Sequence, residues 1–292
     1  ADLFHWTVGG MGLTGVILRA AVRLKAVETG WIRQTLIPAP NLEAAMAALD
    51  ETSHATYSVA WIDCLSKPPA RGRSLIILGE HAAADDLGAH QRAAPYKTPR
   101  KRTSAMPFDA PSFLLNSYTV RAFNALYYRN GLRNSGQTIV DWDSFFYPLD
   151  SVLGWNRIYG RKGFVQFQCA LPAEKAQDGL SALLQEIGKA GQGSFLAVLK
   201  RFRPQDSRFS FPMDGHTLAL DFPVNRKSLA LLDRLDRITL EHDGRFYLAK
   251  DSRMSAETLR QSDDRVDSFL KMRTLDNRSQ AFVSAQSDRL KI

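Results

Sequence analysis

The chain has 292 residues, of which 45% are hydrophobic and 23% charged, a balance typical of a folded globular protein and not of a disordered one. Its net charge of +8 favours anionic partners such as phosphates, nucleotides or an acidic membrane surface, but does not choose among them. No run of about eighteen apolar residues is present, so the sequence contains no candidate membrane-spanning helix.

A glycine-rich stretch opens the chain, TVGGMGLTGVI at residues 7–17. Glycines at this density let the backbone turn tightly and leave amide groups free to bind phosphate or a nucleotide base. The alternating residues 16–27 then predict a strand, and because no helix follows, the stretch fits neither the Walker nor the Rossmann pattern. A glycine turn without a ligand is the alternative, and composition does not decide between the two.

Strands and helices then alternate in two similar series. Asn41 is the expected N-cap of the first helix. Together the two series predict an α+β fold, in which a mixed, largely antiparallel sheet carries helices on one face. Strands are predicted over residues 35–38, 57–65, 74–78, 163–171, 194–202, 216–222 and 246–249, and helices over 42–49, 113–128, 173–189, 228–240 and 257–273.

The usual metal and hydrolytic motifs are missing from the sequence. The six histidines show no HExxH or HxH spacing, and no GxSxG stretch is present. Cys64 and Cys169 each lie in an apolar strand pattern, which indicates buried reduced thiols in a reducing compartment. Chemistry without a metal or a nucleophile motif points to a bound cofactor that carries the reaction.

Several polar residues interrupt the predicted strands. Gln166 and Gln168 alternate with apolar residues, so both fall on one face of their strand, where they either face water or line a pocket that binds several hydroxyls. Lys200 and Asp221 lie near the ends of two other apolar strands. Strand-end charges are usually solvated, but convergence with Lys250 would give these residues a shared polar rim.

Lys250 follows the predicted strand 246–249 and precedes a helix. Burial at such a junction can lower the pKa of a lysine and direct its ammonium group at a substrate. The alternative is a solvated lysine paired with Asp251. A second basic feature is the proline-rich segment 97–102, which contains Lys97, Arg100, Lys101 and Arg102 and predicts an exposed loop; a solvated loop is the main interpretation, and nucleic-acid binding is not expected.

Six ordered stretches together resemble the FAD-linked oxidoreductases of the vanillyl-alcohol-oxidase type. Within that family the chain looks most like the decaprenylphosphoryl-ribose 2'-oxidase branch. It departs from that branch at Thr217 and Ala219, where those enzymes carry asparagine and cysteine, which puts the decaprenyl-phosphate substrate in question. The stretches that carry the resemblance are residues 7–15, 57–63, 146–150, 155–157, 163–168 and 247–253.

The resemblance implies a division into three parts. Residues 1–28 would be the C-terminal part of an FAD-binding domain, 29–244 a ferredoxin-like substrate domain, and 245–292 a return segment to the FAD-binding domain. The N-terminal half-domain of the family, which cradles the FAD pyrophosphate, has no counterpart in this sequence. We therefore expect a fragment that contains remnants of a two-part FAD-binding domain, holds FAD weakly or not at all, and is inactive alone.

The resemblance also implies roles for individual residues. Lys250 would be the active-site lysine of an Ala-Lys-Asp-Ser-Arg motif, positioning a sugar hydroxyl or helping its deprotonation while a hydride passes from carbon to flavin N5 and leaves a ketone. The cofactor-binding residues implied are Gly9, Gly10, Gly12, Thr14, Gly15, Val16, Ile17 and Tyr247. The substrate-binding residues implied are Trp61, Tyr147, Gln166, Gln168, Lys200, Phe202 and Asp221. No metal is expected.

The expected substrate is a sugar, a sugar phosphate or a polyol, and a short-chain reductase could act on the keto product. A cytoplasmic location is expected, with peripheral membrane contact through residues 97–102 as an option. One alternative in the same fold is an oxidase of the D-arabinono-1,4-lactone type, although the His-Trp-x-Lys ending usual in that subfamily is missing here. The alternative from another class is a non-catalytic module that binds an anionic lipid or protein partner.

Overall fold

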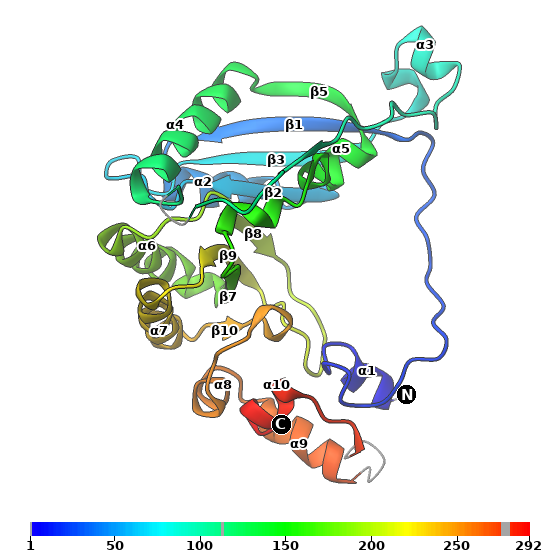
Figure 1. Cartoon of the computed structure of the whole chain (residues 1–292). Coiled ribbons are helices and arrows are strands. Elements are labelled where there is room, and N and C mark those ends of the chain that lie inside the picture. The colour runs from blue at the N-terminus through cyan, green and yellow to red at the C-terminus, as the bar shows by residue number, and fades with distance from the viewer. Residues whose placement is uncertain (1, 112–113, 276–280) are drawn as a thin grey trace.

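An eight-stranded sheet organises the computed structural model, which describes residues 2–111, 114–275 and 281–292. Its strand order is β10-β7-β9-β8-β2-β3-β1-β5, and every neighbouring pair is antiparallel, which confirms the expected α+β fold (Figure 1). The strands are β1 (Trp31–Ala39), β2 (Tyr57–Ile62), β3 (Ser74–His81), β5 (Gly136–Asp141), β7 (Phe164–Pro172), β8 (Val198–Phe202), β9 (Gly215–Pro223) and β10 (Arg245–Phe246). Two short strands, β4 (Ser104–Ala105) and β6 (Val152–Leu153), form a separate parallel pair.

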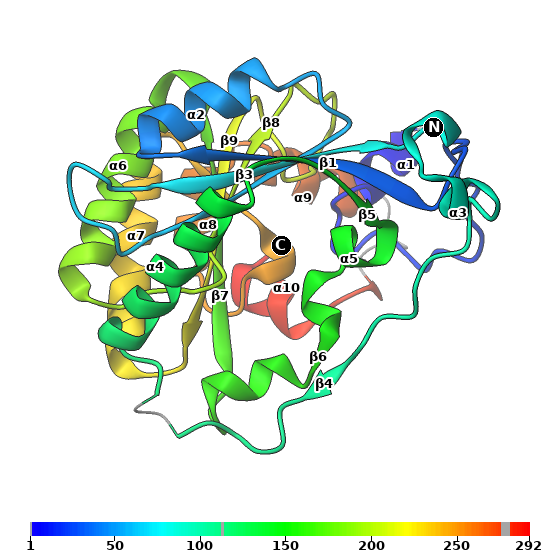
Figure 2. The same cartoon turned by 90° about the horizontal axis from the view of Figure 1, so that it is seen from above.

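Three helices, α2 (Leu42–Glu51), α6 (Ala173–Ala190) and α7 (Arg226–Glu241), cover one face of this sheet (Figure 2). Asn41 caps α2 as predicted, because its side chain accepts a hydrogen bond from the backbone N–H of Ala44 at 2.9 Å. The other helices are α1 (Asp2–Thr7), α3 (Ala89–Arg92), α4 (Ser117–Arg133), α5 (Trp142–Phe146), α8 (Ala256–Ser262), α9 (Val266–Leu275) and α10 (Ala285–Leu290).

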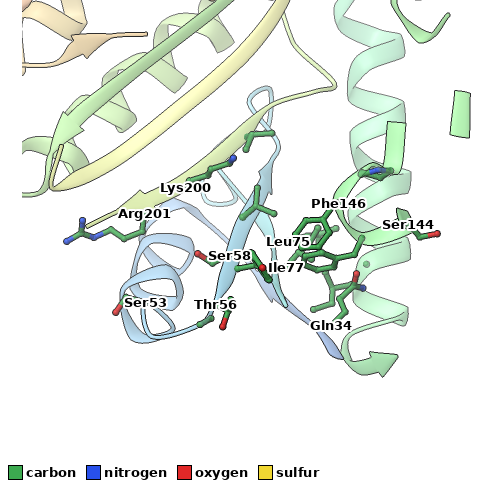
Figure 3. Close-up of a pocket in the computed structure, with 18 of the residues that line it drawn as sticks. Gln34, Ser53, Thr56, Ser58, Leu75, Ile77, Ser144, Phe146, Lys200 and Arg201 are labelled. Atoms are coloured by element: carbon green, nitrogen blue, oxygen red, sulfur yellow. The ribbon is translucent and has the colours of Figure 1, made fainter. Parts of the chain in front are cut away.

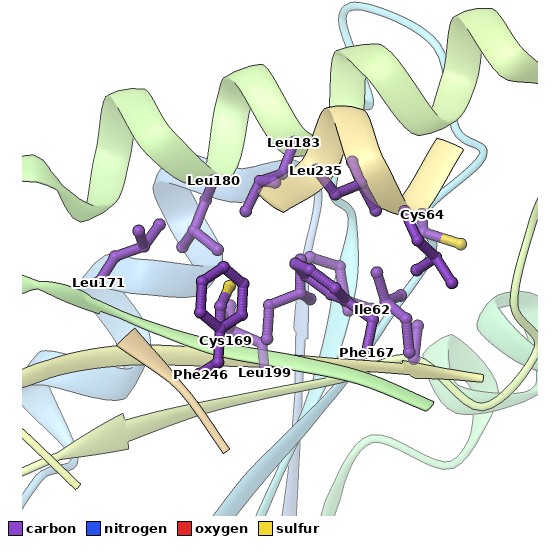
Figure 4. Packing of buried hydrophobic residues seen from close by; sticks show 14 of the residues in the cluster. Ile62, Cys64, Phe167, Cys169, Leu171, Leu180, Leu183, Leu199, Leu235 and Phe246 are labelled. Atoms are coloured by element: carbon purple, nitrogen blue, oxygen red, sulfur yellow. The ribbon is translucent and has the colours of Figure 1, made fainter. Parts of the chain in front are cut away.

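The main core lies between the sheet and these three helices (Figure 4). In β7, Val165, Phe167 and Cys169 alternate toward the core, and the adjacent Phe222 of β9 is fully buried. In α6, Leu180 and Leu183 recur at helical spacing and are fully buried. Burial of these apolar surfaces removes them from water and is the main stabilisation of this half of the molecule.

The register determines which side chains share the opposite face. Directly opposed residues of antiparallel strands project to the same side. Gln166 opposes Asp221, and Lys200 opposes Thr217. Trp61 opposes Val198, which in turn opposes Ala219, the partner of Gln168. We call this side the site face; it carries most of the predicted substrate-binding residues.

The helix α4 packs on the site face, not against the core helices. Gly131 of α4 lies so close to Leu75 that a Cβ at this position would sit 2.4 Å from the leucine side chain. Leu75 opposes Trp61, whose ring packs against Tyr127 of α4 with centroids 4.7 Å apart. The helix predicted over 113–128 is therefore present as Ser117–Arg133, and residue 113 lies outside the described residues.

Three predictions of local structure are wrong. Residues 16–27 form no strand but an extended, exposed segment, because no described strand pairs with them (Figure 1). The strand predicted over 246–249 ends at Phe246, and Leu248–Lys250 forms a 3-10 turn, because only Arg245 and Phe246 pair with β7. The single tail helix predicted over 257–273 is divided between α8 and α9.

Candidate active site

Two glutamine side chains form the centre of the site face. Gln166 Nε2 donates to a carboxylate oxygen of Asp221 at 2.9 Å, and Gln168 Nε2 donates to Thr217 Oγ1 at 3.0 Å. Burial raises the pKa of Asp221, while the hydrogen bond from Gln166 and the charge of Lys250 oppose that shift. Three of the predicted substrate-binding residues, Gln166, Gln168 and Asp221, therefore lie together.

Two lysines flank the glutamines. Although the Lys200 side chain is exposed, the surrounding protein and the charge of Lys250 lower its pKa. Neither ammonium group forms an ion pair with a carboxylate among the described residues. Two cations that repel each other and have no carboxylate partner there form a favourable place for an anionic group.

The turn that carries Lys250 is held by a polar network on its C-terminal side. Arg253 makes a bidentate ion pair with Asp236 of α7, with N···O distances of 2.7 and 2.8 Å. Asp251 accepts from Arg289 at 2.8 Å and from the backbone N–H of Met254 at 2.8 Å. The solvated Lys250–Asp251 pair considered from the sequence is not formed, because Arg289 and backbone amides occupy the Asp251 carboxylate.

An aromatic wall connects β8 with the lysine turn. The Phe211 ring stacks on Tyr247 with centroids 4.8 Å apart and meets Phe202 edge-on at 5.8 Å. Tyr247 also donates its backbone N–H to the carbonyl of Gln168 at 3.0 Å. Phe211 thereby joins the predicted flavin contact Tyr247 and the predicted substrate contact Phe202 in one cluster. No sequence pattern had indicated Phe211 as part of the site.

The glycine-rich stretch divides into two parts. A Cβ on Gly9 would lie 2.6 Å from the Ser210 backbone, and one on Gly10 would lie 2.4 Å from the Trp6 carbonyl, so both are needed for packing within the chain. Gly12, at φ +75°, has no atom within 4 Å of such a Cβ, and Gly15, at φ +140°, has only Phe282 at that distance. Only the second part is an open backbone cradle of the kind that a nucleotide can approach.

The remaining residues predicted in this stretch have unlike surroundings. Thr14 is turned inward, where its hydroxyl shares a hydrogen bond of 2.9 Å with that of Thr7. Val16 and Ile17 are exposed at the start of the extended segment. Large apolar side chains left in water in an extended chain indicate a surface that fits another strand or a ligand.

A cavity of about 870 Å³ extends from Lys200 and Phe202 across β2, β3 and β1 to α4 and α5 (Figure 3). Leu75, Ile77 and Phe146 give it apolar walls. No local pattern in the sequence indicates this cavity. The aromatic-rich passage over residues 142–159 was the available signal, but its position across the sheet depends on the packing of α4 and on strand β5.

Trp61 and Tyr147 have different positions relative to this site. Trp61 lies on the site face but is buried against Tyr127 of α4, and its indole N–H is bonded to the Phe195 carbonyl at 3.1 Å, so it offers a ligand neither an open ring nor a free donor. Tyr147 lies at the end of α5 with its ring 6.2 Å from that of Trp142, and it does not line the lysine–glutamine cluster. The structure thus places Trp61 beside β8 under α4, and neither Trp61 nor Tyr147 lines the lysine–glutamine cluster.

Other predicted features have clear structural counterparts. Cys64 and Cys169 are buried free thiols. Lys97, Arg100 and Arg102 are exposed, whereas Lys101 donates to the Asp143 carbonyl and forms an ion pair with its carboxylate. Within residues 2–111, 114–275 and 281–292 there is no acidic, histidine or cysteine cluster that could hold a metal, and no helix long and apolar enough to cross a membrane.

Comparison with known proteins places this geometry in context. The chain is 35% identical over its whole length to decaprenylphosphoryl-beta-D-ribose oxidase of Mycolicibacterium smegmatis, and it spans 64% of the length of that oxidase. It is 30% identical over 99% of its length to an uncharacterized Streptomyces coelicolor protein encoded in the mprA 5' region, of which it spans 80%. No family model matches the chain. The chain is thus related over its whole length to decaprenylphosphoryl-beta-D-ribose oxidase, as the motifs described above indicate, and resembles a portion of that FAD-linked oxidoreductase.

Proposed function

We propose that this chain is the substrate-binding part of an FAD-dependent oxidoreductase that oxidises a hydroxyl of a sugar, a sugar phosphate or a polyol to a ketone. The observation that carries the proposal is the convergence of Lys200, Lys250, Gln166 and Gln168 from three separate segments on one face of the sheet. Such a set combines cations with neutral hydrogen-bonding amides, which suits a ligand that has both an anionic group and hydroxyls.

Each of these residues would have a separate role in binding or catalysis. Lys250, on a turn fixed by Asp251 and Arg253, would hold the reacting hydroxyl and favour its deprotonation. Gln166 and Gln168 would bind neighbouring hydroxyls. Bound FAD would supply the hydride acceptor.

The pair of lysines supports a phosphorylated substrate over a neutral one. Their ammonium groups repel each other, and an anionic group bound between them would offset this repulsion. The adjoining cavity, with Leu75, Ile77 and Phe146 in its walls, has room for an apolar or aromatic extension of the same molecule. The name of the mycobacterial relative, which joins a ribose to a decaprenylphosphoryl group, is in keeping with such a ligand.

FAD would be held weakly by these 292 residues alone. Gly12 and Gly15 form an open cradle, but the segment that follows, residues 16–27, is extended and exposed along its whole length. A nucleotide bound to so open a surface would keep most of its contact with water, and little of its area would be buried. We therefore propose the division of the chain into residues 1–28, 29–244 and 245–292 as a functional one, in which the first and last parts contact the cofactor.

Peripheral contact with an anionic membrane is a second proposal, supported by the exposed cations Lys97, Arg100 and Arg102. Sedimentation with phosphatidylglycerol vesicles should fall when these three are changed to glutamine and should weaken at high salt. Sedimentation that is the same for the variant and at high salt would contradict the contact. A short-chain reductase that consumes the keto product stays a proposal on chemical grounds.

The direct test of the oxidoreductase proposal uses the product of the whole gene, loaded with FAD. Under anaerobic conditions, free and phosphorylated pentoses and pentitols are screened for bleaching of the flavin absorbance near 450 nm. We expect bleaching by at least one sugar or polyol, with phosphorylated forms acting at lower concentration. If none of them reduces a fully loaded flavin, the proposal fails.

A further inference from the structure

The two glutamines of the site face have a hydrogen-bond polarity that their partners determine. An amide side chain has a donor end, NH₂, and an acceptor end, the carbonyl oxygen, and which end faces a ligand decides what the ligand must provide. At this site the polarity follows from the donors and acceptors that surround each amide.

For Gln168 the deciding residue is Thr217, which is 1% exposed. Its hydroxyl donates to the backbone carbonyl of Cys169 at 2.8 Å. A hydroxyl has one proton, so Thr217 Oγ1 can only accept from its other neighbour. That neighbour is Gln168, which must therefore present its NH₂ group to Thr217, as the distance of 3.0 Å from Nε2 indicates.

For Gln166 the deciding residue is Asp221. Its Oδ1 atom accepts a hydrogen bond from Gln166 Nε2 at 2.9 Å, so Gln166 also presents its NH₂ group to β9. The backbone N–H of Asp221 donates to Ser194 Oγ at 3.1 Å, which fixes the strand at this residue. Both amides thus donate their NH₂ groups to acceptors on β9, the strand beside them.

The carbonyl oxygens of the two glutamines are left on the other side of each amide plane, away from β9. No donor among the described residues reaches either of them. That side is where β10 and the Tyr247–Lys250 turn lie, and the backbone N–H of Tyr247 donates to the backbone carbonyl of Gln168 there at 3.0 Å. The site face of β7 therefore offers a ligand two acceptors, placed two residues apart on one strand.

We infer that Thr217 and Asp221 set the specificity of the site, because they turn both glutamine carbonyl oxygens toward the ligand and so select a molecule with two neighbouring hydroxyl donors. This inference rests on the proposed function and names the ligand feature that the glutamines recognise. An alcohol can donate to these oxygens, whereas a ketone or an ether at the same place can only accept. A compound in which one of these two hydroxyls is replaced by a carbonyl or an ether would accordingly be held less well.

The orientation is tested without catalysis by NMR of the side-chain amides in the chain of 292 residues. Resonances of Gln166 and Gln168 are assigned with Gln→Met variants, and exchange of their NH₂ protons with water is measured. Thr217→Val removes the acceptor with little change in shape, and Thr217→Ser restores it. We expect exchange at Gln168 to become about tenfold faster or more in the valine variant, to return in the serine variant, and to stay unchanged at Gln166 in both.

An equal exchange rate at Gln168 in the wild type and the valine variant would overturn the orientation. The serine variant keeps the hydroxyl and so shows whether the acceptor itself is responsible. A general disturbance of the fold by Thr217→Val would change the exchange rate at Gln166 as well. Asp221→Asn gives the matching test for Gln166, since the asparagine can turn its own NH₂ group toward the glutamine.

Recognition of hydroxyls is tested in the FAD-loaded product of the whole gene by calorimetry. The probes are a pentitol phosphate, the same compound with its hydroxyls methylated, and inorganic phosphate alone. We expect methylation to weaken binding about tenfold or more, and Thr217→Val to reduce that difference. Equal affinity for the free and the methylated probe, or affinity no greater than that of phosphate, would overturn the inference. Failure of the flavin-bleaching screen would instead contradict the proposed function and leave the amide exchange result as it is.

Discussion

The two faces of the central sheet differ in how far their side chains are buried or paired within the chain. On the core face, Phe167, Leu218 and Phe222 are at most 3% exposed and pack under α6 and α7. On the site face, the ammonium groups of Lys200 and Lys250 have no carboxylate partner among the described residues, and the carbonyls of Gln166 and Gln168 have no donor there.

The difference separates stability from function within single strands. In β7 alternate residues serve one purpose or the other: Val165, Phe167 and Cys169 build the core, and Gln166 and Gln168 face the site. Polar groups without partners add little to folding and are kept where a ligand needs them. Substitutions on the core face should therefore change the free energy of unfolding, and substitutions at the centre of the site face should change binding and catalysis.

The largest effect on stability is expected from Phe222→Ala. The ring is fully buried, so its removal leaves a cavity and should cost about 3–5 kcal/mol of unfolding free energy. Phe202→Ala, on the site face of β8 and half-buried, is the matched control and should cost about half as much or less. Urea denaturation of both variants measures the difference, and equal losses would contradict the division between the faces.

A smaller loss is expected where a polar network anchors α4 to the sheet. Asp63, 2% exposed, accepts from Arg73 at 2.8 and 3.0 Å and from Asn124 of α4 at 2.7 Å. Asp63→Ala strands these donors and should cost about 2–3 kcal/mol. Asp86→Ala, which removes an exposed pair with Arg33 and an acceptor for the Ala83 backbone N–H, should change stability by about 1 kcal/mol or less in the same denaturation experiment. Similar losses in the two variants would show that the network does not anchor the helix.

The smallest effect concerns the core thiols. Burial raises the pKa of Cys64 and of Cys169 from 9.0 to about 12, so both stay protonated in the folded protein at ordinary pH. The unfolded thiols ionise first, so stability should fall as pH rises above about 9. At pH 8, Ellman's reagent should react with neither thiol in the native state and with both after unfolding in guanidinium. Rapid reaction of a native thiol would show that the core is open.

The sequence predicts the core face well because its signals are local. The alternation from Val165 to Leu171 and the Asn41 cap each depend on a few neighbouring residues. The strand β5 was missed because its first residues, Gly136, Gln137 and Thr138, are exposed and carry no apolar alternation. For residues 16–27 the opposite holds: the alternation is present, but a strand also needs a neighbouring strand.

The site was predictable only in part. The alternation of Gln166 and Gln168 placed them on one face, and the family resemblance singled out Lys250. Their meeting with Lys200 and Thr217 depends on the strand order β7-β9-β8, which pairs segments distant in the sequence. The large cavity depends on the contact of Gly131 with Leu75, which no local pattern indicates.

The central claim is that the site face performs the chemistry through Lys250, and the rate of flavin reduction tests it most directly. In the FAD-loaded product of the whole gene, Lys250→Met is compared in anaerobic stopped flow with Lys227→Met. Lys227 is exposed to solvent on α7, a helix on the opposite side of the sheet from the site face. We predict that Lys250→Met lowers the reduction rate about a hundredfold or more at unchanged flavin content, while Lys227→Met has no effect. Reduction by Lys250→Met at the wild-type rate would contradict the account.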